Sequence, residues 1–108
     1  MSEKFKNYIN NNWVDPITEK YFKSTSPADN DEVLGLFASS NAQDANIAIN
    51  SAYDGFQNWK KTSQITRGEY LYKASNWLEQ NISRYAEAIT KECGKSILES
   101  TGEVGRSI

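Results

Sequence analysis

The sequence predicts an α/β fold in which two short antiparallel β-hairpins are followed by three or four amphipathic helices. Up to about Ala38, the apolar residues come in short β-prone runs that are separated by turn residues. From Ser40 onward, they recur at intervals of three or four positions, which is the period of a helix. We therefore expect a small antiparallel sheet over residues 1–39 and a helical part over residues 40–108.

Two hairpins account for the first part of the chain. In the stretch YINNNWV (residues 8–14), asparagines separate two apolar pairs, and asparagine tolerates the positive φ of a tight turn. Further on, the β-prone runs Tyr21–Thr25 and Val33–Ala38 flank the turn-rich stretch SPADNDE. Each pair of runs is therefore expected to pair as an antiparallel hairpin.

The second part is expected to begin with two helical segments. Ser40 and Gln43 form a capping-box pattern, and the apolar stripe that follows it runs to Trp59. The next segment starts near Ile65, and the stretch Asn81-Ile82-Ser83 is expected to interrupt it. Both segments keep apolar residues on one face, so each is predicted to be amphipathic.

The stretch ITKECGKS (residues 89–96) contains the one cysteine of the chain and ends like a phosphate-binding loop. Such a loop needs a glycine five positions before Gly94, where this chain has Ile89. A nucleophilic cysteine would need a base, and the chain has no histidine, although a neighbouring lysine or a helix terminus could lower the pKa of the thiol. We interpret Cys93 as a small half-buried packing residue near the end of a helix.

The same stretch contains signals for a helix end and a helix start. Gly94 is placed to end the preceding helix, because glycine adopts the left-handed conformation at little cost. Ser96 and Glu99 then form a capping box, and the apolar stripe after it is still running at Ile108. The sequence therefore predicts a final helix that reaches the end of the chain, and it indicates the N-terminal piece of a longer protein.

Composition argues against several classes of partner. The 108 residues carry a net charge of −2, and the lysines and arginines are scattered, which does not favour nucleic acid or an anionic membrane surface. No apolar run is long enough to span a bilayer, and the first ten residues have no apolar signal core. One cysteine builds no disulfide framework. We therefore expect a cytoplasmic protein that binds neither nucleic acid nor membrane.

The order of the motifs resembles a known family. YINNNWVD, YFKSTSPADNDEVLG, NAQDANIAINSAYDGFQNW, RGEYLYKASNWLEQN and AITKECGKSILESTGEVGRSI follow one another along the chain. Together they resemble the N-terminal region of the NAD(P)-dependent aldehyde dehydrogenase superfamily, over roughly Tyr8 to Ile108. Asn11 replaces the glycine of the family hairpin, Ser26 replaces the asparagine before a proline, and Asp31 replaces a turn glycine. These departures concern local turn geometry.

The resemblance implies a parent enzyme that oxidises an aldehyde to a carboxylic acid and reduces NAD or NADP. In the family, a cysteine forms a thiohemiacetal, a hydride passes to the cofactor, and a glutamate activates the water that hydrolyses the thioester. Those residues lie downstream of this region, Cys93 is not at the nucleophile position, and the six glycines form no G-x-G-x-x-G. The chain is therefore expected to be part of the cofactor-binding domain, with no catalytic or cofactor-binding residue and no activity alone.

The resemblance also implies one ion site. In several members of the family, a monovalent cation lies between a backbone carbonyl before the N-P turn and an acid of the E-x-G-K segment. By position, the matching residues here are Ser24, Thr25 and Glu92. Oxygen ligands suit a hard cation. The alternative interpretation is that Glu92 faces solvent in the last turn of its helix.

Two functional hypotheses remain open from the sequence. In the first, the chain is the N-terminal fragment of an aldehyde dehydrogenase, whose partners are the remainder of that chain and further copies in a homo-oligomer. In the second, the chain is a stand-alone, non-catalytic binding module that has kept the fold. A third hypothesis, a helical nucleic-acid adaptor, is disfavoured by the balance of charges.

Overall fold

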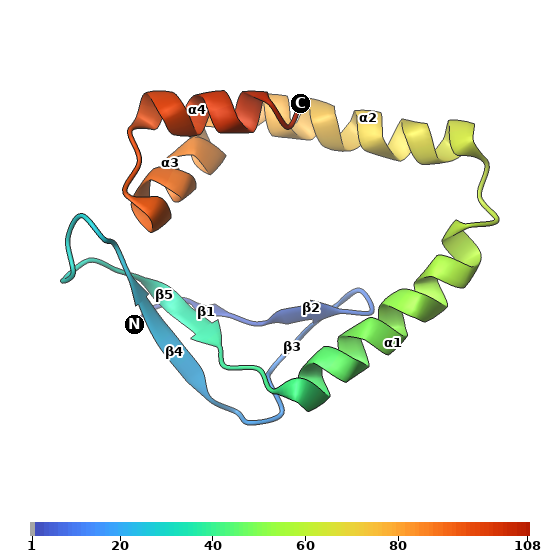
Figure 1. Cartoon of the computed structure of the whole chain (residues 1–108), viewed down its shortest axis with the longest axis horizontal. Helices are drawn as coiled ribbons and strands as arrows, with labels where there is room; N and C mark the ends of the chain where they lie inside the picture. Colours follow the sequence, from blue (N-terminus) through green and yellow to red (C-terminus); the bar gives the residue numbers. More distant parts are fainter. Residues whose placement is uncertain (1) are drawn as a thin grey trace. The chain divides into compact units, whose positions relative to one another are not determined.

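The computed structural model describes residues 2–108, which form two compact units (Figure 1). The first unit contains the chain up to Ser24 and Val33–Thr62, and the second contains Thr25–Glu32 and Ser63–Ile108. Five short strands and one helix come first in the chain, and three further helices follow in the second unit. The predicted α/β order of elements, hairpins first and helices afterwards, is confirmed.

The first hairpin joins β2 (Asn7–Ile9) to the antiparallel strand β3 (Asn12–Val14). Its turn residues Asn10 and Asn11 have φ values of 50° and 61°, in the left-handed region that asparagine tolerates better than other side chains do. Asn11 thus takes a conformation that glycine would adopt freely. The aromatic rings of the cross-strand pair Tyr8 and Trp13 lie 4.8 Å apart, which adds side-chain contact to the backbone pairing.

The second sheet has three strands in the order β1 (Lys4–Phe5), β5 (Val33–Ala38), β4 (Tyr21–Thr25). The predicted pairing of the last two is confirmed, and backbone bonds close both ends of their hairpin: Ser39 N–H to the carbonyl of Lys20, and Ser26 N–H to the carbonyl of Glu32. The prediction of one antiparallel sheet was wrong, because β1 pairs parallel to β5 and the β2–β3 hairpin forms a sheet of its own. A strand of two residues carries no periodic signal in the sequence.

Helix α1 (Ala42–Trp59) begins one residue later than predicted. Asn41, not Ser40, is its N-cap: the Asn41 side chain accepts hydrogen bonds from two backbone amides, and the Asp44 carboxylate accepts one from the Asn41 amide. Ser40 instead exchanges hydrogen bonds with the Asn7 side chain. Asp44 is 5% exposed, and its second oxygen accepts the backbone N–H of Ile17 at 3.0 Å, which ties the helix start to the loop after β3.

In the second unit, the predicted break at the Asn81 stretch is confirmed. Asn81 separates α2 (Gln64–Gln80) from α3 (Ile82–Cys93), with φ −120° and ψ 18°. Its side-chain amide donates to the carbonyl of Trp77 at 2.8 Å, so a local side-chain bond takes part in ending α2. Across the break, the rings of Trp77 and Tyr85 meet edge to face at 5.4 Å.

Helix α4 (Ile97–Gly105) lies against α3 (Figure 1). The buried side chains of these two helices are small. Ala86 and Ser100 are completely buried, and the Thr90 hydroxyl donates to the Ser100 hydroxyl at 2.8 Å. The expectation that this last helix runs to the end of the chain was wrong, because α4 ends at Gly105, a residue of low helix propensity.

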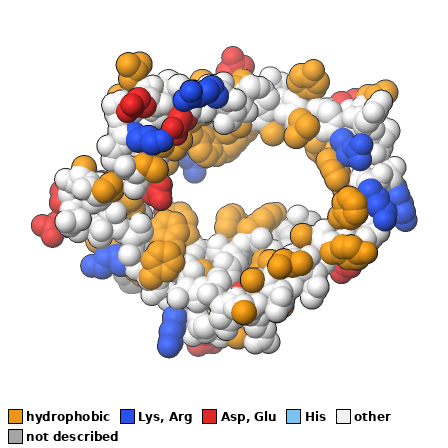
Figure 2. Space-filling view, viewed as in Figure 1, with side chains coloured by type: hydrophobic (Ala, Val, Ile, Leu, Met, Phe, Trp, Pro, Cys, Tyr) orange, Lys and Arg blue, Asp and Glu red, His pale blue; other side chains and the backbone are white. Residues whose placement is uncertain are grey.

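The apolar stripes of the helices are largely exposed within residues 2–108. The buried apolar residues are small, namely Ala86, Val104 and Pro16. Figure 2 shows hydrophobic side chains at the surface of both units. Among them, Ile65 is 73% exposed and Tyr72 is 76% exposed on α2, and Leu98 is 81% exposed on α4. No helix in the described part of the chain is both long and apolar enough to cross a membrane.

Candidate functional site

The turn between α3 and α4 brings together the chemical groups that the sequence singled out. Helix α3 ends at Cys93, and Gly94 follows with φ 73° and ψ 16°, donating its N–H to the carbonyl of Thr90. Ser96 then caps α4: its hydroxyl accepts the amide of Glu99, and the Glu99 carboxylate accepts the amide of Ser96. The predicted helix end and helix start are both confirmed. The Gly-Lys-Ser sequence is therefore used for capping.

Cys93 is exposed, which differs from the expected half-buried packing position. Its thiol donates to Oε2 of Glu92 at 2.9 Å. This hydrogen bond, together with some desolvation, raises the pKa of the Cys93 thiol, and the nearby ammonium of Lys95 opposes that change only in part. An activated cysteine requires a lowered pKa, so these surroundings do not favour a nucleophile.

The reactivity of this thiol provides the first test. Replacing the neighbouring carboxylate by Glu92→Gln should lower the pKa of Cys93 and thus raise its thiolate fraction at pH 8. We expect iodoacetamide to alkylate the variant several-fold faster than the parent chain. Glu87→Gln, on the same helix but facing Lys91, serves as the matched control and should leave the rate unchanged. Equal alkylation rates in all three proteins would show that Glu92 does not control the thiol.

A shallow charged pocket of about 350 Å³ lies beside this turn. Its lining contains both signs of charge, from Lys95, Arg106, Glu99 and Glu103. Lys95 forms an ion pair with Glu103, which raises the pKa of the lysine and lowers the pKa of the glutamate. Because the cations have acidic neighbours, the pocket has no strong preference for an anion such as a phosphate.

The residues of the predicted cation site lie on two elements. Ser24 and Thr25 are half-buried at the end of β4, and Glu92 is exposed in the last turn of α3, where it accepts the thiol hydrogen of Cys93. Ser24 belongs to the first unit, and Thr25 and Glu92 belong to the second. No cluster of three or more His, Cys, Asp or Glu residues suited to a metal occurs in residues 2–108. The cation site stays a prediction.

Comparison with known proteins decides the family. Residues 13–108 match the model of the aldehyde dehydrogenase family. The chain belongs to this family and corresponds to its N-terminal region. The malonate-semialdehyde dehydrogenase of Bacillus velezensis is 40% identical over 105 residues, which cover 97% of this chain and 21% of the relative. The alpha-ketoglutaric semialdehyde dehydrogenase of Bacillus subtilis is 34% identical over 104 residues, with coverages of 96% and 21%.

The solved structures agree with this assignment at the level of the fold. An NAD-dependent aldehyde dehydrogenase from Sinorhizobium meliloti superposes with a TM-score of 0.90 at 22% identity, over 97% of this chain and 21% of that protein. The chain thus spans about a fifth of the length of the aldehyde dehydrogenases that it matches. The resemblance found in the motifs is confirmed, and the fold is that of the corresponding region.

Proposed function

We propose that this chain forms the N-terminal part of an NAD(P)-dependent aldehyde dehydrogenase. The complete enzyme oxidises an aldehyde and water to a carboxylic acid and transfers a hydride to NAD+ or NADP+. In it, residues 1–39 supply a small β region and residues 40–108 supply helices of the cofactor-binding domain. The observation that carries this proposal is the family match over residues 13–108, at about a fifth of the relatives' length.

Within this enzyme, the chain acts as scaffold without a reacting group. Cys93 has a carboxylate neighbour that raises the pKa of its thiol, and the sequence offers no histidine as a base. The six glycines stand elsewhere in the fold: Gly35 lies in β5, Gly94 follows the end of α3, and the other four belong to helices, with Gly105 as the last residue of α4. None stands in the strand-to-helix turn that a dinucleotide-binding loop needs. Nucleophile and cofactor loop are therefore supplied by the remainder of the polypeptide.

The exposed apolar stripes also support the proposal that this chain is scaffold for the remainder of the polypeptide. Ile49, Tyr53 and Phe56 on α1 and Leu71 on α2 are each more than half exposed. An exposed apolar stripe along a helix, such as the one on α1, normally becomes an interface. The remainder of the aldehyde dehydrogenase chain is the partner that covers it, and the complete enzyme assembles further as a homo-oligomer.

Titration with cofactor tests the scaffold role. Calorimetry of the 108-residue chain with NAD+ and with NADP+ is expected to show no binding, because the chain lacks a phosphate-cradling loop. No reduced cofactor should form when malonate semialdehyde is added. The complete malonate-semialdehyde dehydrogenase of Bacillus velezensis, measured in the same way, is the positive control. Micromolar binding of either cofactor to the chain alone would contradict the scaffold role.

A further inference from the structure

The segment Glu3–Lys6, which we call the strap, lies along one side of β5. Its strand β1 pairs parallel to β5, with Lys4 opposite Leu36 and Phe5 opposite Phe37. The backbone N–H of Leu36 donates to the carbonyl of Glu3 at 2.9 Å. Because β4 occupies the other side of β5, the strap covers the side of this strand that would otherwise be an open edge.

The side chain of Phe5 packs on β5, against Gly35 and Phe37, and we call this place the Phe5 site. Its ring stacks on Phe37 with centroids 4.7 Å apart and planes 13° from parallel. The ring also lies over Gly35, which is buried. A Cβ at position 35 would come within 2.5 Å of Cε2 and 2.9 Å of Cδ2 of the Phe5 ring. The missing side chain of Gly35 therefore leaves the room that Phe5 fills.

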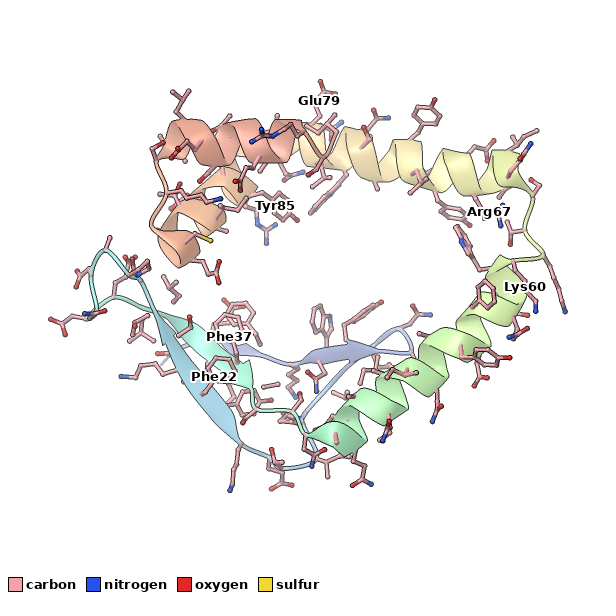
Figure 3. All side chains as sticks on the ribbon, in the orientation of Figure 1. Phe22, Phe37, Lys60, Arg67, Glu79 and Tyr85 are labelled. Atoms are coloured by element: carbon pink, nitrogen blue, oxygen red, sulfur yellow. The ribbon has the colours of Figure 1, made fainter. Side chains whose placement is uncertain are left out.

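A second ring borders the Phe5 site. The ring centroid of Phe22, on β4, lies 6.0 Å from that of Phe37. Figure 3 shows the two side chains on the same side of the sheet. The Phe5 site thus combines the backbone edge of β5 with an aromatic surface. An extended peptide that adds to a sheet edge uses the same two elements: main-chain hydrogen bonds for affinity and a side-chain pocket for specificity.

The lysines of the strap hold it to neighbouring segments. The ammonium of Lys4 lies 4.7 Å from the ring centroid of Tyr21, and that of Lys6 pairs with Asp15 at 2.8 Å. Asp15 also accepts the Tyr21 hydroxyl at 2.6 Å, so both anchors belong to one polar cluster. Very short strands and lysines are the features by which natural sheets protect their outer edges from pairing with other chains.

We propose that β5 and Gly35 form a binding site for an extended segment with an aromatic residue, and that the strap fills this site within its own chain. The strap thereby blocks pairing of β5 with the same segment of a second copy. When the strap is absent, a peptide of its sequence binds in its place. This inference concerns the first unit alone and does not depend on the activity of the complete enzyme.

Hydrogen exchange at the Leu36 amide tests the proposal, because that amide is bonded to the strap. In Phe5→Ala, we expect its exchange to accelerate by about tenfold or more, while amides of the β2–β3 hairpin and of α1 keep their rates. Gly35→Ala should have the same effect, because the added Cβ displaces the ring. Trp13→Ala is the matched control: it removes a 68% exposed aromatic ring from the separate β2–β3 sheet and should leave Leu36 nearly unchanged.

A peptide of residues 2–7 completes the test. Added to a variant that lacks residues 2–6, it should slow the exchange of Leu36, whereas the same peptide with alanine in place of Phe5 should not. An unchanged Leu36 rate in Phe5→Ala would overturn the proposal. So would equal acceleration throughout the first unit in both point variants, which would make the strap an ordinary part of the fold, or a peptide without effect.

Discussion

At micromolar concentration, the 108-residue chain by itself is expected to self-associate and to unfold at a low temperature. The buried apolar residues of the described chain are small, whereas Ile65, Leu71, Tyr72 and Leu98 are each more than two-thirds exposed. Burying one such large side chain stabilises a protein by about 1.5–3 kcal/mol. Leaving several of them exposed therefore loses a stabilising free energy comparable to the whole stability of a small domain, about 5 kcal/mol or more.

Light scattering and differential scanning calorimetry of the isolated chain measure this outcome. The matched variants lie on the same helix: Leu71→Glu removes a 69% exposed apolar side chain, and Asn76→Glu places the same charge at an exposed polar position. We expect the first to reduce association and the second to leave it nearly unchanged. A monomer of high melting temperature at all concentrations would show that the exposed stripes need no partner.

Gly94→Val is expected to destabilise the protein by about 2 kcal/mol or more. The φ of 73° at this position costs an ordinary side chain about 1–2 kcal/mol, and a β-branched one is worse. In addition, a Cβ here would lie 3.0 Å from Cγ of Pro27, within the same compact unit, so the turn before β5 would have to shift. Strain and crowding at position 94 therefore act together to destabilise the variant.

Gly102→Ala is the matched control for this substitution. Gly102 lies inside α4, and a Cβ added there meets nothing within 4 Å. Alanine is favoured over glycine inside helices by about 0.5–1 kcal/mol, so this variant should be neutral or more stable. Urea unfolding of the two variants and the parent gives both free energies. Equal midpoints for Gly94→Val and the parent would mean that the left-handed turn is not required.

The parts of the fold that the sequence predicted correctly depend on contacts between near neighbours in the chain. The asparagine turn follows from the tolerance of Asn10 and Asn11 for positive φ. The break at Asn81 and the helix start at Ser96 each follow from a side chain that bonds to a backbone group a few residues away. The choice of Asn41 over Ser40 as N-cap was missed, because two adjacent residues can both cap. The Asn-x-x-Asp spacing was the signal that favours Asn41.

The parts that were missed depend on residues far apart in the chain. Strand β1 forms because Phe5 fits over Gly35, thirty positions later in the chain. No local sequence pattern indicates that contact. The burial of Asp44 likewise requires the amide of Ile17. At the candidate site, the sequence identified the turn around Cys93, but the exposure of the thiol and its bond to Glu92 depend on the geometry of the helix end.

The role proposed for this chain, scaffold without a reacting group, is tested most directly by turnover in a chimera. This chain would replace the aligned segment of the Bacillus velezensis malonate-semialdehyde dehydrogenase, with and without Cys93→Ser. We expect the chimera to oxidise malonate semialdehyde with NAD+ or NADP+, and Cys93→Ser to keep kcat within about twofold. A correctly folded chimera whose kcat falls by several orders of magnitude on Cys93→Ser would contradict the proposed role.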